Sequence, residues 1–288
     1  MLLEVPFIDD LPLLSRIVVE GFLDGLHRSP FLGYSSEFAS YRSYVPGDNL
    51  RHLDWKVWAR TDALYIRQFE DDTNLRCHVL LDTSASMDFG QGTANKFLSG
   101  RILAAALAQL MVRQRDAPGL ALFGPDARMA LPARASREAA MEVLALLSTA
   151  TPGGETRMGP GLEGIVQTFV RRGLVVVISD FFAAESEVMG LLSRLQGMNQ
   201  EVLVFHLLAP EEVDFPVEGD FIMKDAETGE ERVVDATEFG PTFRQRMQSF
   251  CERVRVECLR RDADYQRLRT DEPIGVALSR YLEKRGTL

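Results

Sequence analysis

Two apolar runs that each end in an aspartate constrain this chain more than any other feature. Residues 174–180 read Leu-Val-Val-Val-Ile-Ser-Asp, and residues 77–82 read Cys-His-Val-Leu-Leu-Asp. Near-continuous apolar runs of this length are typical of strands buried on both faces of a parallel sheet. Parallel strands end at the same edge of a sheet, and ligands bind outside that edge. Asp82 and Asp180 are therefore candidates for a single site.

Helical patterns alternate with strand-like runs from residue 76 onward. The spacing predicts helices at 96–115, 136–147, 161–171, 185–195, 241–261 and 274–284, and further strands at 119–123, 128–132, 201–208 and 265–269. Strands that alternate with helices predict an α/β fold with a doubly wound, mostly parallel sheet of the Rossmann type.

The N-terminal quarter of the chain has a different character. A turn is expected at Pro46-Gly47-Asp48, and the alternation at 64–69 indicates an extended strand, whereas residues 2–24 could form a short helix or an irregular lead-in. We predict a small β-containing N-terminal module at 1–73 and an α/β domain at 74–288. A turn at Thr228-Gly229 predicts a hairpin insertion around 215–236.

Composition and charge exclude several classes of protein. With 46% hydrophobic residues, the 288-residue chain has ample material for a core, and its net charge of −10 argues against a nucleic-acid backbone as the main partner. Residues 1–14 contain acidic but no basic residues, unlike a signal peptide, and the longest apolar stretch, 102–112, is too short to span a bilayer. We therefore expect a cytoplasmic protein without membrane insertion.

Cysteine and histidine offer no metal cluster. The three cysteines form no CxxC motif and the four histidines are scattered, so neither a disulfide framework nor a zinc site is expected. His78 and His206 lie in strand-like runs and are interpreted as structural histidines.

Hard oxygen donors occur instead in three separate segments. The first holds Asp82, Ser84 and Ser86 at alternate positions, the second is a loop with Thr156, and the third is the strand end at Asp180. Two carboxylates and several hydroxyls suit a small hard cation, Mg²⁺ or Mn²⁺. On the first segment alone, Asp82 or a serine could instead cap the following helix.

This three-part pattern resembles the von Willebrand factor A domain with its metal-ion-dependent adhesion site. The resemblance implies that Asp82, Ser84, Ser86, Thr156 and Asp180 hold one Mg²⁺. One departure is that the family usually reads Gly-Gly-Thr, whereas Glu155 displaces the threonine here by one residue, so Glu155 could substitute for it or the site could be weakened. In addition, Phe181 follows Asp180 where glycine is more usual.

The segment before the sheet carries a second resemblance. Residues 36–42, 44–56 and 59–61, with Tyr44-Val45-Pro46-Gly47-Asp48 and Asp54-Trp55-Lys56 among them, are similar to the signature of the domain-of-unknown-function 58 family. The resemblance covers nearly all of the chain from Gly25 on. Members of this family often carry N-terminal membrane helices, which this sequence lacks, so we expect it to be one of the soluble members. It implies pairing with a MoxR-type AAA+ ATPase in systems that assist the maturation or metal loading of other proteins.

Three functions are compatible with these features. The first is a non-enzymatic, metal-dependent binding module whose cation bridges to an Asp or Glu of a partner protein. The second is a metal-dependent hydrolase, such as a phosphatase or nuclease, for which Asp88 and Glu155 are the candidate bases. In the third, the N-terminal module recognises an acidic surface and the metal site is structural or vestigial; its candidate residues are Arg42, Arg51, Lys56, Arg60 and Arg67.

Overall fold

The computed structural model describes residues 10–27, 40–43, 60, 64–68, 75–124, 130–153, 166, 169, 172–182, 185–215, 220–224, 231–276 and 278. The chain divides into two compact units, one formed by residues 1–28 with 75–288 and the other by residues 29–74. In the second unit, β1 (Ser40–Ser43) pairs antiparallel with β2 (Tyr65–Gln68). The larger unit includes helix α1 (Leu11–His27), although the sequence pattern places it in a module at 1–73.

A six-stranded sheet forms the centre of the larger unit, in the order β10-β7-β6-β3-β4-β5. Five of its strands are parallel and β5 alone is antiparallel, which confirms the predicted doubly wound, mostly parallel sheet. The strands are β3 (Arg76–Asp82), β4 (Ala117–Phe123), β5 (Ala130–Leu131), β6 (Leu174–Ser179), β7 (Glu201–Leu208) and β10 (Ala263–Arg269).

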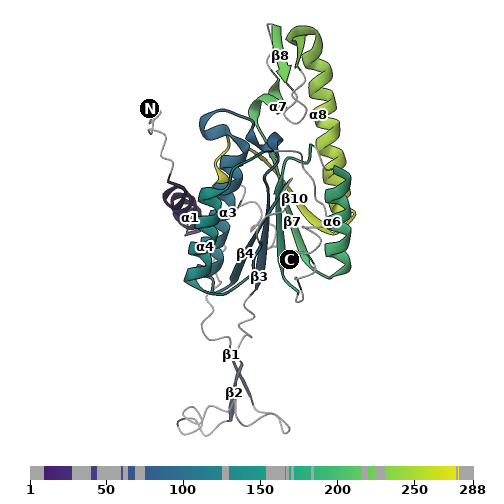
Figure 1. Ribbon diagram of the computed structural model, residues 1–288. Coiled ribbons are helices and arrows are strands. Elements are labelled where there is room, and N and C mark those ends of the chain that lie inside the picture. The colour runs from purple at the N-terminus through teal and green to yellow at the C-terminus, as the bar shows by residue number, and fades with distance from the viewer. Residues whose placement is uncertain are drawn as a thin grey trace. The chain divides into compact units, whose positions relative to one another are not determined.

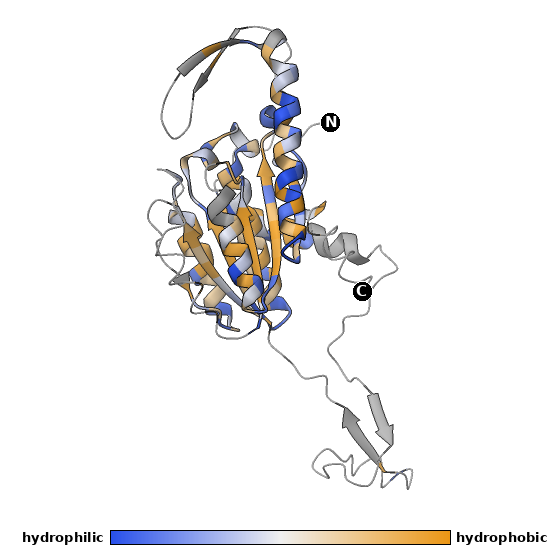
Figure 2. Ribbon diagram, turned by 90° about the vertical axis from the view of Figure 1, so that its right-hand side faces the viewer, coloured by the Kyte–Doolittle hydropathy of each residue, from blue (hydrophilic) through white to orange (hydrophobic). Residues whose placement is uncertain are grey.

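Helices cover both faces of this sheet (Figure 1). Helices α3 (Lys96–Arg113) and α4 (Arg137–Thr149) lie on one face with α1, whereas α6 (Glu185–Gly197) and α8 (Ala236–Leu259) lie on the other. Two apolar clusters result, because successive strand side chains point to opposite faces: Leu81 packs in one and Leu80 in the other. Figure 2 shows the strands as the most hydrophobic part of the unit, which explains their nearly continuous apolar sequences.

Side-chain caps set where the helices begin. The Asn95 side chain accepts a hydrogen bond from the Leu98 N–H at the start of α3, and Ser136 accepts one from the Ala139 N–H at the start of α4. Helix α8 begins at Ala236 instead of the predicted residue 241, because Asp235 accepts a hydrogen bond from the Thr237 N–H one turn before Pro241.

A hairpin precedes α8. Strands β8 (Asp220–Lys224) and β9 (Glu231–Asp235) pair antiparallel, which confirms the hairpin predicted around 215–236. Its predicted turn at 228–229, and most of the helices predicted at 161–171 and 274–284, lie outside the described residues.

Helix α3 packs closely against side chains of the sheet at Gly100. A Cβ atom there would lie 2.8 Å from Leu81 Cδ1 and 3.3 Å from Leu207 Cδ1. We expect Gly100→Val to lower the free energy of unfolding by about 1–3 kcal/mol, because the added methyl groups overpack this contact. Urea unfolding measures the change.

Gly190→Ala in α6 is the matched control. A Cβ atom at this exposed helical position meets no other atom within 4 Å, so the substitution should raise stability by about 1 kcal/mol through helix propensity alone. Equal stability of Gly100→Val and the wild-type chain would contradict the close packing of α3.

Candidate functional site

The candidate site lies where β3 and β6 end side by side. Residues Leu81 and Ile178 are paired in register, so the next positions, Asp82 and Ser179, adjoin. Strand β3 pairs with β4 on one side and with β6 on the other. The connection from β3 to β4 and the later connection from β5 to β6 therefore run in opposite directions across the sheet. This edge is the topological switch point of the sheet, the place where ligands bind in open α/β folds.

Four of the five predicted site residues meet here. Asp82 Oδ1 accepts a hydrogen bond from the Ser84 N–H at 2.9 Å, and the Ser84 and Ser86 Oγ atoms are 3.0 Å apart. Ser86 Oγ in turn donates to Asp180 Oδ1 at 3.2 Å. All four residues are buried, and Ser86 is the most exposed of them at 7%. Of these four side chains, the hydroxyl-bearing side chain of Ser86 is therefore the closest to solvent.

The fifth residue, Thr156, and its neighbour Glu155 lie outside the described residues. The loop that leads to them starts at the site, because the Gly153 N–H donates a hydrogen bond to the Thr83 C=O at 2.9 Å. The capping alternative for Ser84 is not supported: Ser84 precedes the short helix η2 (Ala85–Asp88), but its side chain makes no capping hydrogen bond.

A buried lysine completes the site and was not predicted from the sequence. Lys96, the first residue of α3, is fully buried, and its Nζ lies 2.7 Å from Asp180 Oδ2 and 2.6 Å from Glu212 Oε1. Glu212 belongs to α7 (Pro210–Asp214), and its other oxygen accepts a hydrogen bond from the Ala209 N–H at 2.8 Å. The only signal in the sequence was a lysine in the first turn of a helix, where the helix dipole opposes a positive charge.

The charges of this cluster do not balance. Three carboxylates, Asp82, Asp180 and Glu212, are buried in the site with a single ammonium group, so full ionisation leaves an excess of two negative charges. Burial, and then the charge of Asp180, raise the pKa of Asp82 to about 7. Burial also raises the pKa of Glu212 above its ordinary value. A divalent cation is the kind of ligand that would neutralise such a site.

The oxygen atoms have a spacing that suits Mg²⁺. The separations of 3.0 Å between the two serine Oγ atoms and 3.2 Å from Ser86 to Asp180 match the edge of an octahedron with bonds of about 2.1 Å. Nowhere in the described part of the chain do three His, Cys, Asp or Glu side chains form a metal-binding group. The fit therefore depends on the two hydroxyls as well as on the carboxylates.

The backbone is strained directly after Asp180, at the edge of the candidate site. Phe181, directly after Asp180, has a φ of 62°, a left-handed conformation that is rare for a bulky residue. Its N–H donates a hydrogen bond to Ser179 Oγ at 3.0 Å and its buried ring packs edge-on against His206. The usual glycine would adopt this conformation without strain, and such strain concentrates at functional sites.

The candidate residues of the two alternative functions are only partly within the described residues. Asp88 is exposed and its Oδ1 accepts a hydrogen bond from Asn95 at 3.2 Å. Arg42 and Arg67 lie in β1 and β2 and Arg60 is exposed, whereas Arg51 and Lys56 lie outside the described residues. Burial lowers the pKa of His206 to about 4, and its Nδ1 lies 2.8 Å from Tyr265 Oη, as expected for a structural histidine.

Solved structures share this fold at low sequence identity. The conserved hypothetical protein BatB from Bacteroides thetaiotaomicron has a TM-score of 0.50 and 18% identity, over 74% of this chain and 100% of that chain. An aerotolerance-related membrane protein from Bacteroides fragilis has a TM-score of 0.51 and 18% identity, over 73% of this chain and 98% of that chain. The sheet order and the likeness to these two structures confirm the predicted doubly wound α/β fold.

The predicted cytoplasmic location is contradicted by these likenesses, because a protein described as a membrane protein carries the same fold. The prediction came from the lack of basic residues in 1–14 and from the short apolar runs, and neither feature determines where an α/β domain of this kind is located. Within the described ranges, no helix combines the length and the apolar character needed to cross a bilayer.

Sequence similarity identifies the family. The uncharacterized protein Rv1480 of Mycobacterium tuberculosis is 31% identical over 214 residues, which are 73% of this chain and 67% of that protein. The family model described as "protein of unknown function DUF58" matches residues 40–257. The chain therefore belongs to the DUF58 family, as its sequence signature predicts.

Proposed function

We propose that this chain is a protein-interaction module that captures an acidic residue of a partner through a divalent cation. The resemblance of the sequence to the von Willebrand factor A domain, together with the observed sheet order, supports an interaction module. The cation, Mg²⁺ or Mn²⁺, would be held by Asp82, Ser84, Ser86, Asp180 and Thr156. The observation that carries the proposal is the meeting of two serine hydroxyls and two carboxylates at the switch point of the sheet.

Hydrogen bonds fix the orientation of both aspartates of the site. Asp82 is fixed through both oxygens, by the Ser84 N–H and by Ser179 Oγ, which donates at 2.6 Å. Lys96 holds one oxygen of Asp180 and leaves the other directed at Ser86. Because hydroxyls are neutral ligands and the site's excess negative charge only balances the cation, a bound cation could still accept a partner's carboxylate at an open coordination position.

The proposal also covers the class of partner and the choice between binding and catalysis. From the family resemblance of the sequence alone, we also propose a MoxR-type AAA+ ATPase as the partner and an accessory role in protein maturation. We propose binding instead of catalysis, because a hydrolytic site needs a base beside the cation and Asp88, the candidate within the described residues, is exposed and bonded to Asn95.

The cation site is tested by calorimetric titration of Mg²⁺ and Mn²⁺ into the full chain. We expect saturable binding that EDTA reverses, and an affinity at least about tenfold lower for Asp82→Asn, which removes one carboxylate charge and keeps the side chain's shape.

Asp88→Asn is the control, because it removes the same charge from an exposed position nearby. Its affinity should equal that of the wild-type chain. The proposed site would be refuted if the wild-type chain showed no heat of binding with Mg²⁺ or Mn²⁺. It would also be refuted if the wild-type chain and Asp82→Asn had equal affinities.

The role of Lys96 is tested by urea unfolding of Lys96→Met. We expect the free energy of unfolding to fall by about 3–5 kcal/mol, because two buried carboxylates lose their counter-ion. Glu212→Gln in the same chain should restore part of that loss, and Mg²⁺ should stabilise Lys96→Met more than the wild-type chain.

Arg172→Met is the comparison for an exposed ion pair. Arg172 lies 3.3 Å from Glu201 at the surface, so its loss should change stability by less than about 1 kcal/mol. If Lys96→Met has an equally small effect, the buried pair does not support the site.

A further inference from the structure

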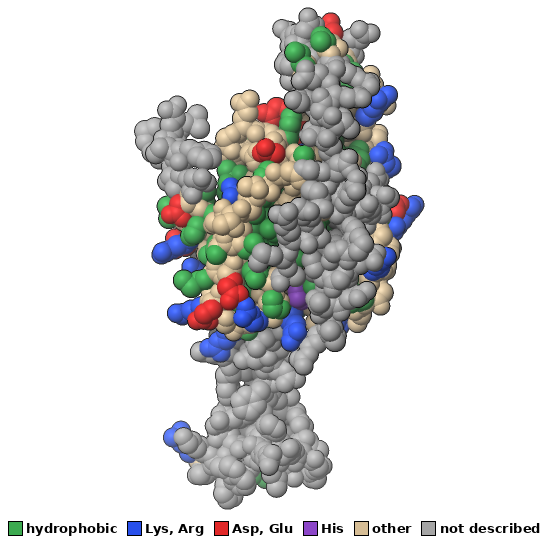
Figure 3. Space-filling model, in the orientation of Figure 1, with side chains coloured by type: hydrophobic (Ala, Val, Ile, Leu, Met, Phe, Trp, Pro, Cys, Tyr) green, Lys and Arg blue, Asp and Glu red, His purple; other side chains and the backbone are tan. Residues whose placement is uncertain are grey.

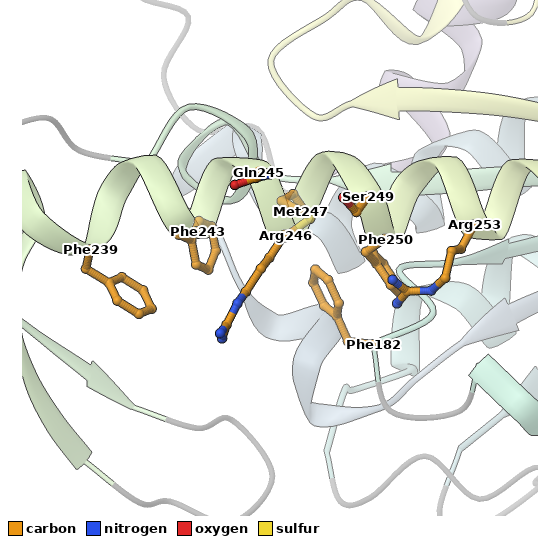
Figure 4. A pocket seen from close by; sticks show the side chains of 9 residues that line it. All are labelled: Phe182, Phe239, Phe243, Gln245, Arg246, Met247, Ser249, Phe250 and Arg253. Carbon is orange, nitrogen blue, oxygen red and sulfur yellow. The ribbon is translucent and has the colours of Figure 1, made fainter.

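A pocket lined by aromatic side chains runs along α8 beside the candidate site. Its volume is about 640 Å³, within the range of ligand-binding pockets. Figure 4 shows Phe239, Phe243, Arg246 and Phe250 projecting from one side of α8, with the Phe182 ring pointing toward the helix from the opposite wall. We call this pocket, with Arg253 at its end, the α8 groove.

Phe182 joins the α8 groove to the candidate site. Its N–H donates a hydrogen bond to Asp180 Oδ1 at 3.2 Å, and its ring centroid is 4.7 Å from Lys96 Nζ. The same ring stacks on Phe250 with centroids 5.3 Å apart, and 37% of Phe182 is exposed. One residue thus forms both the rim of the site and the wall of the groove.

The charge of the α8 groove differs from that of the chain. The chain as a whole carries a net charge of −10, and on the face shown in Figure 3 the described acidic and basic side chains are interspersed. Among the described lining residues, by contrast, Arg246 and Arg253 are exposed and basic and none is acidic. Aromatic faces beside guanidinium groups favour a ligand that is both apolar and negatively charged.

We propose that the α8 groove binds a segment of a partner protein in which an aromatic or large aliphatic residue lies next to acidic residues. The inference rests on the proposed function in one respect: the same segment supplies the carboxylate at the strand-end site. The apolar side chain would enter between Phe182, Phe243 and Phe250, and acidic neighbours would face Arg246 and Arg253. Aromatic anchors in such pockets dominate the free energy of protein association.

The test is selection from a phage-displayed random peptide library on the full chain in the presence of Mg²⁺. We expect enriched peptides to combine Asp or Glu with Phe, Trp or Leu. Synthetic fluorescent copies should bind Arg246→Gln about tenfold more weakly than the wild-type chain, as measured by anisotropy, because a charge-assisted contact is lost.

Gln248→Glu is the matched control, because it makes the same change in net charge at an exposed position of α8 that does not line the groove. It should leave the affinity unchanged. Basic or purely polar enriched sequences, or equal binding to Arg246→Gln and the wild-type chain, would overturn the inference.

Asp82→Asn separates this inference from the proposed function. Peptides that respond to Arg246→Gln but not to Asp82→Asn or EDTA would support the groove and reject the cation bridge. Peptides that respond to Asp82→Asn but not to Arg246→Gln would reject the groove and leave the cation bridge standing.

Discussion

The buried ammonium group of Lys96 is the interaction on which the site depends. It lies between Asp180, at the end of β6, and Glu212, in α7, and it comes from the first turn of α3. A buried charge is tolerated only when its partners are fixed, so this contact holds three segments that are distant in the sequence at one edge of the sheet. The strand-end aspartate is thereby oriented before any ligand arrives.

The same contact explains two local features that are otherwise unfavourable. A lysine at the start of α3 opposes the helix dipole, and Phe181 adopts a left-handed backbone conformation. Both place polar atoms around Asp180: the lysine contacts one carboxylate oxygen, and the turn after β6 brings the Phe182 N–H to the other. The site is thus built at some cost in local stability, as is common where a ligand binds.

The fold was predictable because its main signals are local. Runs such as 174–178 are apolar at every position, and only a strand covered on both faces requires that. The convergence of Asp82, Ser84, Ser86 and Asp180 followed from strand direction alone. Lys96 and Glu212 could not be predicted in the same way, because each resembles an ordinary helix-start residue until the packing of α3 and α7 buries it. The predicted cytoplasmic location was wrong because the charges of residues 1–14 and the length of apolar runs do not determine where such a domain is located.

The central claim, that the strand-end oxygens hold a divalent cation, is tested most directly by crystals of the full chain grown with Mn²⁺. The account predicts an anomalous difference peak about 2.1 Å from the Oγ atoms of both Ser84 and Ser86, with Lys96 still bonded to Asp180. Crystals grown with Mn²⁺ that show no peak at these oxygens, and in which the two hydroxyls bond only to each other and to Asp180, would contradict it.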